Sequence, residues 1–188
     1  MGNQNSLKEI PRFETERLLL REFTERDAQN IFEYASDPEV IFFMPWDKHE
    51  TLEDTNEYLS KSKVAFQNSD NIDFGIELKS ENKLIGAISV RNWNNINSCA
   101  DVGYVVARKY WGKGIAAEAL KAVIKFGFED LQVNRIEAHC DENNSASFRV
   151  MEKVGMKYEG THRQKIFIKG KFISIRYYSI LKSEYFVV

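Results

Sequence analysis

Two glycines, Gly112 and Gly114, stand one residue apart between a strand-like run and a helix-like run of the chain. The run before them, residues 102–106, is apolar, and helical periodicity starts at Ile115. Glycine allows a positive φ and lets a ligand approach the backbone closely. Successive backbone N–H groups at the start of a helix bind phosphate. The segment therefore predicts a site for a ligand that carries a pyrophosphate.

Other phosphate-binding motifs fit this segment less well. A Walker loop requires Ser or Thr after its Gly-Lys pair, whereas Gly114 follows Lys113 here. A dinucleotide-binding fingerprint tolerates Ala117 at its third glycine position, but its strand should open a βαβ unit. The strand in question lies past the middle of the chain, which argues against that class.

The segment Lys109-x-x-Gly112-x-Gly114 resembles the acetyl-CoA loop Gln/Arg-x-x-Gly-x-Gly/Ala of the GNAT N-acetyltransferases. The match continues in order through residues 135–138, 144–156, 158–161 and 169–172. Residues 15–21 resemble the first strand of one branch, the ribosomal-protein N-terminal (RimJ/RimL-type) acetyltransferases. Two positions depart from the pattern. Lys109 replaces Gln or Arg, and Ile166 stands where members of this branch can carry a catalytic Glu.

Hydrophobic periodicity predicts a mixed α/β fold. The expected strands cover residues 18–23, 74–78, 84–90, 99–106, 135–140, 156–161 and 172–181, and the expected helices cover residues 27–34, 51–66, 115–128 and 145–154. The resemblance adds the GNAT acyl-CoA N-acyltransferase topology, a central and mostly antiparallel sheet flanked by helices, with the fourth and fifth strands of the fold splayed apart. It also implies a single domain over residues 15–188 after an N-terminal extension of residues 1–14.

The resemblance implies that acetyl-CoA lies along residues 104–106, with its pyrophosphate over residues 111–116. The residues that it assigns to acetyl-CoA are Tyr104, Val105, Val106, Lys109, Trp111, Gly112, Lys113, Gly114, Ile115, Ala116, Ala117, Asn144, Ser147 and Arg149. Asn144 would contact the pantetheine arm, and Ser147 would assist the departing thiolate. Without the resemblance, Asn144 and Ser147 are simply helix-capping residues, and Glu118 and Lys121 are exposed helix residues.

The general base is left open among Asp101, Glu137 and His139, because Ile166 offers no carboxylate; Glu137 is more simply a solvated strand residue. At pH 7 a lysine amine loses its proton at a cost of about 4.6 kcal/mol, whereas an N-terminal α-amine needs only about 1–1.4 kcal/mol. An α-amine acceptor, or a proton relay through water, is therefore easier to reconcile with this chain. On the acceptor side we expect Phe43 and Trp46, together with Tyr104, beside the acidic residues 47–54. The alternative is that this segment is a hydrophobic plug followed by acids that favour a helix start.

Three functions remain in play at this point. The first is acetyl transfer to a protein N-terminus, and the resemblance implies a ribosomal protein as the acceptor. The second is acetyl transfer to a small amine such as a polyamine, an amino acid or an aminoglycoside. The third is a CoA-binding sensor that does not catalyse. A closed acceptor pocket would favour a small amine, and an open groove would favour a peptide.

Composition bounds these choices. The chain has 188 residues, a net charge of −2 and a pI near 6.0, so we expect one domain and no nucleic-acid partner. No run reaches transmembrane length, and the myristoylation pattern of residues 1–6 lacks a polybasic second signal, so no membrane association is expected. Cys99 and Cys140 read as buried thiols, and no His or Cys spacing predicts a metal. We expect a cytoplasmic monomer or homodimer.

Overall fold

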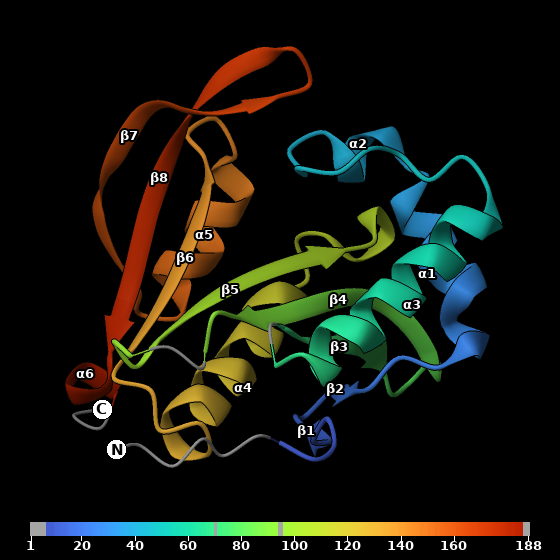
Figure 1. Ribbon diagram of the computed structural model, residues 1–188, viewed down its shortest axis with the longest axis horizontal. Coiled ribbons are helices and arrows are strands. Elements are labelled where there is room, and N and C mark those ends of the chain that lie inside the picture. Colours follow the sequence, from blue (N-terminus) through green and yellow to red (C-terminus); the bar gives the residue numbers. More distant parts are fainter. Residues whose placement is uncertain (1–6, 70, 94–95, 186–188) are drawn as a thin grey trace.

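The computed structural model describes residues 7–69, 71–93 and 96–185, so the myristoylation pattern of residues 1–6 lies outside the described part. The described residues form one mixed sheet with strand order β1-β2-β3-β4-β5-β6-β8-β7 (Figure 1). The strands are β1 Phe13–Glu14, β2 Leu18–Arg21, β3 Asn71–Leu78, β4 Lys83–Arg91, β5 Cys99–Val106, β6 Arg135–Asp141, β7 Lys157–Ile168 and β8 Lys171–Leu181. Only β5 and β6 pair in parallel, so the sheet is mostly antiparallel, as predicted.

Helices cover both faces of this sheet. They are α1 Ala28–Ala35, α2 Pro38–Ile41, α3 Leu52–Gln67, α4 Ile115–Glu129, α5 Ser145–Lys153 and α6 Lys182–Tyr185, with single 3₁₀ turns at Glu25–Asp27 and Arg108–Tyr110. Helices α1 and α3 lie over β3 and β4, and α4 lies on the other face (Figure 1). Thr51 and Asp54 form the predicted capping box at the start of α3. In the described part of the chain, no helix is both long and apolar enough to cross a membrane.

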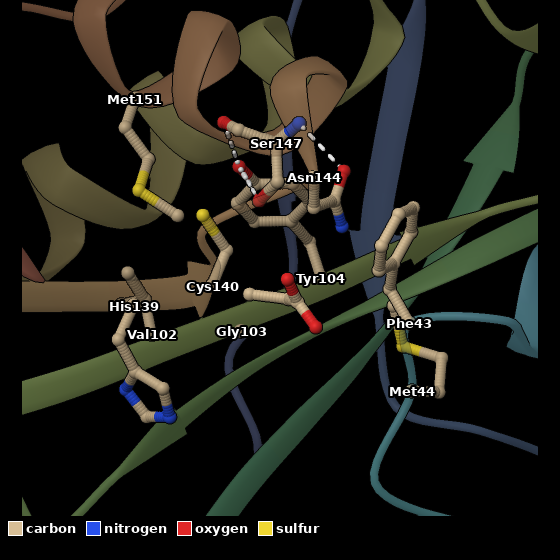
Figure 2. Close-up of a pocket in the computed structure, with 11 residues that line it drawn as sticks. Phe43, Met44, Val102, Gly103, Tyr104, His139, Cys140, Asn144, Ser147 and Met151 are labelled. Atoms are coloured by element: carbon tan, nitrogen blue, oxygen red, sulfur yellow. Dashed lines mark hydrogen bonds between the residues drawn. The ribbon is translucent and has the colours of Figure 1, made fainter. Parts of the chain in front are cut away.

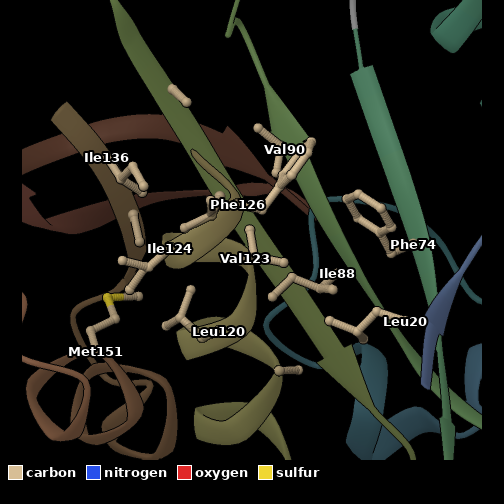
Figure 3. Close-up of a cluster of buried hydrophobic side chains, with 14 of the residues drawn as sticks. Leu20, Phe74, Ile88, Val90, Leu120, Val123, Ile124, Phe126, Ile136 and Met151 are labelled. Carbon is tan, nitrogen blue, oxygen red and sulfur yellow. The ribbon is translucent and has the colours of Figure 1, made fainter. Parts of the chain in front are cut away.

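The main core lies between the sheet and α4. Figure 3 shows side chains of β2, β3, β4, α4, β6 and α5 meeting there, among them Phe74, Ile88, Leu120, Phe126 and Met151. A smaller cluster under α1 contains Ile31, Tyr34, Ala35, Val40 and Leu84. Strand β4 is buried at successive positions and serves both clusters, with Leu84 in the small one and Ile85 in the main one, because successive strand residues face opposite sides of the sheet.

The N-terminal segment packs on this core. Leu7 and Ile10 contact the main cluster, and the Phe13 ring lies 5.0 Å from Phe74 and 5.6 Å from Phe126 between centroids. Phe13–Glu14 also pairs with β2. The described part of the expected extension therefore adds an edge strand and apolar side chains to the domain.

Strand β7 is longer than predicted. It runs to Ile168 and forms a hairpin with β8 through Lys169 and Gly170, whose φ values are +49° and +80°. Its second half is mostly exposed and carries no strict apolar alternation, so sequence periodicity could not identify it. The backbone pairing with β8, and not burial, makes this segment a strand.

Strands β5 and β6 separate part-way along their length. Their pairing runs from Cys99 with Arg135 to Val102 with Ala138. Beyond these pairs, residues 103–106 remain paired with β4, and β6 turns away toward β8 (Figure 1). The predicted splayed strand pair is therefore present. Alternate residues of 103–106 direct their backbone N–H and C=O groups toward the opening.

Candidate active site

A pocket lies where β5 and β6 separate. Its volume is about 100 Å³. Both strands line it, together with the start of α5 and the segment after α2: Phe43, Met44, Val102, Gly103, Tyr104, His139, Cys140, Asp141, Asn144, Ser147 and Met151 (Figure 2). The pocket exists because β5 and β6 stop pairing here, which leaves a gap between the two strands.

Two hydroxyl groups meet in this pocket. The Tyr104 hydroxyl lies 3.0 Å from Ser147 Oγ and 2.9 Å from the Ser147 carbonyl oxygen, which can only accept (Figure 2). Burial raises the pKa of Tyr104, so this group remains a neutral hydroxyl. Ser147 N–H donates to Asn144 Oδ1 at 3.1 Å, which fixes the first turn of α5. Asn144 therefore caps the helix and also lines the pocket.

A carboxylate and an imidazole lie on the β5–β6 surface beside this pocket. His139 Nδ1 is 3.4 Å from Asp101 Oδ1, and Arg91 Nη2 is 4.0 Å from the same oxygen. The His139 ring extends away from Ser147 (Figure 2) and lies 5.6 Å from the Tyr177 ring. Glu137, the other acidic candidate, is instead paired with Arg135, whose Nε donates to its Oε1 at 2.6 Å. The structure thus joins two of the candidate bases into one pair.

A larger groove of about 470 Å³ opens beside the two glycines. Its lining comes from the start of α4, the residues before β2 and the end of α5: Glu16, Arg17, Gly112, Lys113, Gly114, Ala117, Glu118, Lys121 and Lys153. Gly112 and Gly114 have φ values of +73° and +77°, which other residue types rarely adopt. Apart from Gly112 itself and its two chain neighbours, no atom of the described residues lies within 4 Å of a Cβ built on Gly112. The backbone here is an open cradle at the N-terminus of a 15-residue helix.

Comparison with known proteins now decides the family. The acetyltransferase (GNAT) domain model matches residues 17–157. The chain belongs to the GNAT acetyltransferase family. It is 35% identical over 172 residues to the uncharacterized N-acetyltransferase YnaD of Bacillus subtilis, covering 91% of this chain and 97% of YnaD. The protein is therefore an acyltransferase.

Two further GNAT relatives bear on the site. The crystal structure of a GNAT-family acetyltransferase from Bacillus anthracis superposes with a TM-score of 0.84 at 34% identity, covering 93% of this chain and 100% of that one. "Putative ribosomal N-acetyltransferase YdaF" of Bacillus subtilis is 35% identical over 113 residues, covering 59% of this chain and 62% of that protein. The family takes its acetyl group from acetyl-CoA, and the open cradle at Gly112 and Gly114 fits the pyrophosphate of that co-substrate.

The residues expected to bind acetyl-CoA in this GNAT chain divide into two groups. Gly112, Lys113, Gly114 and Ala117 line the groove, and Tyr104, Asn144 and Ser147 line the pocket. Five others line neither cavity: Val106 and Ile115 are in the main core, Ala116 is partly buried against it, Val105 is partly buried against the small cluster, and Arg149 is exposed on α5. Trp111 Nε1 donates to the Val106 carbonyl at 2.7 Å.

Lys109 has a different partner from the one that the motif suggests. Its amine lies 3.3 Å from Glu81 Oε2 and 5.2 Å from the centre of the Tyr110 ring. Lys109 is absent from the groove lining among the described residues. In this structure it joins the loop to the β3–β4 turn.

The acceptor-side residues also separate. Phe43 lines the pocket, with Met44 beside it. Trp46 instead packs on the small cluster under α1, and its ring lies 5.7 Å from His49. Asp54 accepts hydrogen bonds from the Thr51 and Glu50 backbone N–H groups, which hold its pKa below the usual range. The Asp54 carboxylate therefore caps the N-terminus of α3.

Sequence reasoning misjudged Glu118. We expected an exposed helix residue, but its side chain is only 18% exposed, and it is bonded to Thr15 and Arg17. No local signal predicts this contact, because Thr15 and Arg17 precede Glu118 by more than 100 residues. The cysteines differ too: Cys140 is buried in the pocket, whereas Cys99 is only partly buried.

Proposed function

We propose that this GNAT enzyme transfers the acetyl group of acetyl-CoA to the α-amine at the N-terminus of a protein, by direct attack of the amine on the thioester. The strand opening carries this proposal. It brings Tyr104, Ser147 and His139 together in the lining of one pocket, with Asp101 beside His139, at the end of a free strand edge that starts from the glycine cradle.

The hydroxyl pair suits the departing thiolate. As the amine nitrogen bonds to the carbonyl carbon, the carbon–sulfur bond breaks and its electron pair stays on sulfur. A thiol has a pKa near ~8.5, so the thiolate needs only modest help. The Ser147 hydroxyl can supply it as a hydrogen-bond donor, because Tyr104 can donate its own proton to the Ser147 carbonyl oxygen.

The acceptor amine must reach the site without its proton. We assign this proton to the Asp101–His139 pair, in which His139 Nδ1 lies 3.4 Å from the carboxylate oxygen Oδ1. Ile166, at the position where a catalytic Glu can stand, is a half-buried residue paired with Ile173. A weak base is sufficient for an α-amine, whose deprotonation at pH 7 needs only about 1–1.4 kcal/mol.

The similarity to the putative ribosomal N-acetyltransferase YdaF favours a ribosomal protein as the acceptor. The small pocket volume of about 100 Å³ favours the alternative acceptor, a small amine.

Release of free thiol from acetyl-CoA separates these alternatives. We would compare a lysine-free peptide with a free N-terminus, the same peptide with a blocked N-terminus and one lysine, and a polyamine. The proposal expects turnover with the first peptide only. Turnover with the polyamine alone would establish the small-amine alternative. Turnover of the blocked peptide would contradict the α-amine assignment.

A further inference from the structure

The carboxylate of Glu118, in the first turn of α4, fixes the position of Arg17. Glu118 Oε1 accepts from Thr15 Oγ1 at 2.5 Å and from the Arg17 backbone N–H at 2.9 Å. Glu118 Oε2 accepts from Arg17 Nε at 2.6 Å and lies 2.6 Å from Arg17 Nη2. Burial raises the pKa of Glu118, but these donors outweigh it and leave the pKa below its ordinary value. The guanidinium is therefore held in one orientation.

The same guanidinium also contacts the glycine loop. Arg17 Nη1 donates to the Lys113 carbonyl oxygen at 2.9 Å. A Cβ built on Gly114 would lie 3.6 Å from Arg17 Nη2 and 3.8 Å from Lys153 Nζ. Two cations, one from before β2 and one from the end of α5, thus face the same volume above Gly114.

This arrangement suits an anion at that point. Two like charges this close repel each other, and the N-terminus of α4 adds positive potential. Glu118 is occupied by Thr15 and Arg17, while Lys113 and Lys121 add charge along the groove. Glu16 is the other carboxylate among the described lining residues, and it is exposed. An arginine whose fork is pre-oriented binds phosphate with little loss of freedom.

We infer that Arg17 and Lys153 clamp a phosphate group of CoA above Gly114, with Glu118 as the residue that positions Arg17. This inference rests on the proposed use of acetyl-CoA, and it adds two side chains from outside the glycine loop to the binding site. CoA carries a pyrophosphate and a 3′-phosphate, and both have the chemistry that this clamp recognises. Dephospho-CoA, which lacks the 3′-phosphate, distinguishes them.

Calorimetric titration with CoA tests the clamp. We expect Arg17→Gln and Lys153→Gln each to weaken CoA binding by about tenfold. Lys125→Gln is the matched control. It removes the same charge, but Lys125 lies elsewhere on α4, in an exposed ion pair with Glu129. It should change the affinity by less than about twofold. An effect of Arg17→Gln or Lys153→Gln no larger than that of the control would overturn the clamp.

The same variants titrated with dephospho-CoA identify the phosphate. An equal tenfold loss with both ligands assigns the clamp to the pyrophosphate, and a loss seen only with CoA assigns it to the 3′-phosphate. Absence of CoA binding by the unaltered protein would defeat the proposed function itself, which is a separate outcome. Lys153 takes no part in the hydrogen bonds that Glu118 makes with Thr15 and Arg17. Lys153→Gln therefore still tests the clamp if Arg17→Gln unfolds the protein.

Steady-state kinetics tests the positioning role of Glu118. Glu118→Gln keeps the side-chain size but removes the charge that orients Arg17. We expect the KM for acetyl-CoA to rise by about threefold or more, with kcat at saturation within about twofold of the original value. A fall in kcat at unchanged KM would refute this role.

Discussion

The groove beside Gly112 and Gly114 and the β7–β8 hairpin are fixed by different kinds of contact. At the groove, positive-φ backbone and a largely buried carboxylate hold the loop against the sheet. At the hairpin tip, the contacts are a hydrogen bond from Lys169 Nζ to the Ile41 carbonyl at 2.6 Å and a Lys171 amine 5.8 Å from the centre of the Phe42 ring.

The base of the hairpin has its own carboxylate. Glu159 is bound by Arg135 and accepts from Ser179 Oγ at 2.7 Å. Toward the tip, Phe167 and Phe172 are 61% and 62% exposed. The groove is therefore the more firmly held of the two regions, and the exposed hairpin tip should open more easily, since segments with few buried contacts open most easily.

The largest expected effect is on the groove. Gly114→Trp should weaken acetyl-CoA binding by at least about 100-fold, or about 2.7 kcal/mol, because the new side chain fills the cradle and strains a φ of +77°. Gly170→Trp is the matched control, since Gly170 has a φ of +80° but lies at the hairpin tip. Calorimetry should show unchanged donor affinity for the control. Equal affinities for both variants would refute the loop assignment.

The next effect separates chemistry from donor binding. Ser147→Ala should lower kcat by about 10- to 100-fold, because the departing thiolate loses a hydrogen-bond donor, with the Kd for acetyl-CoA within about twofold. Ser145→Ala, at the start of the same helix, is the control. A change confined to the donor Kd would make Ser147 a capping and binding residue only.

A smaller effect concerns the base of the hairpin. Hydrogen bonds from Arg135 and Ser179 lower the pKa of Glu159 from 4.5 to about 2. A carboxylate with a lowered pKa stabilises the fold above pH ~4.5, and this contribution is lost as the pH falls toward ~2. The side chain is 42% exposed, so solvent screening reduces the contribution to about 1 kcal/mol.

Urea denaturation checks this pH dependence. Glu159→Gln should be less stable than the original protein by about 1 kcal/mol at pH 7, with the gap reduced to roughly half at pH 3. Glu57→Gln, which alters an exposed pair with Lys61, should show almost no gap at either pH. A gap of the same size at pH 7 and pH 3 would mean that the ionised carboxylate is not what stabilises the hairpin.

The smallest effect is expected at the hairpin tip. Lys169→Met removes the hydrogen bond to Ile41 and should change the KM for the acceptor by about threefold, without altering the donor Kd. Lys165→Met, at an exposed position of β7, is the control. If the two substitutions change the acceptor KM equally, the tip contact has no specific effect on acceptor binding.

Sequence periodicity predicted the elements around the donor well. Strand β5 has the predicted bounds, and α4 ends one residue later than expected. Both are local patterns: apolar alternation in the strand, glycine at the loop and an amphipathic helix after it. The second half of β7 was missed because an exposed hairpin needs no apolar alternation.

Part of the candidate site could also be predicted from the sequence. The glycine loop, Tyr104 and Ser147 are signalled by motif, and the structure places them in the two cavities. Trp46 lies apart from the pocket lining, because one aromatic run supplies both Phe43 at the pocket and Trp46 at the α1 cluster. The sequence of this aromatic run does not indicate which of its side chains faces the pocket and which faces the α1 cluster.

By itself the sequence determined the strand–loop–helix unit with its two glycines, and through that motif the family. These features depend on backbone preferences and on periodicity among neighbouring residues. Only the tertiary structure decided which distant polar groups meet, such as Tyr104 with Ser147, Asp101 with His139 and Arg17 with Glu118. Such pairs depend on sheet register, on where β5 and β6 separate, and on how α4 and α5 pack, and each of these is settled by contacts across the whole chain.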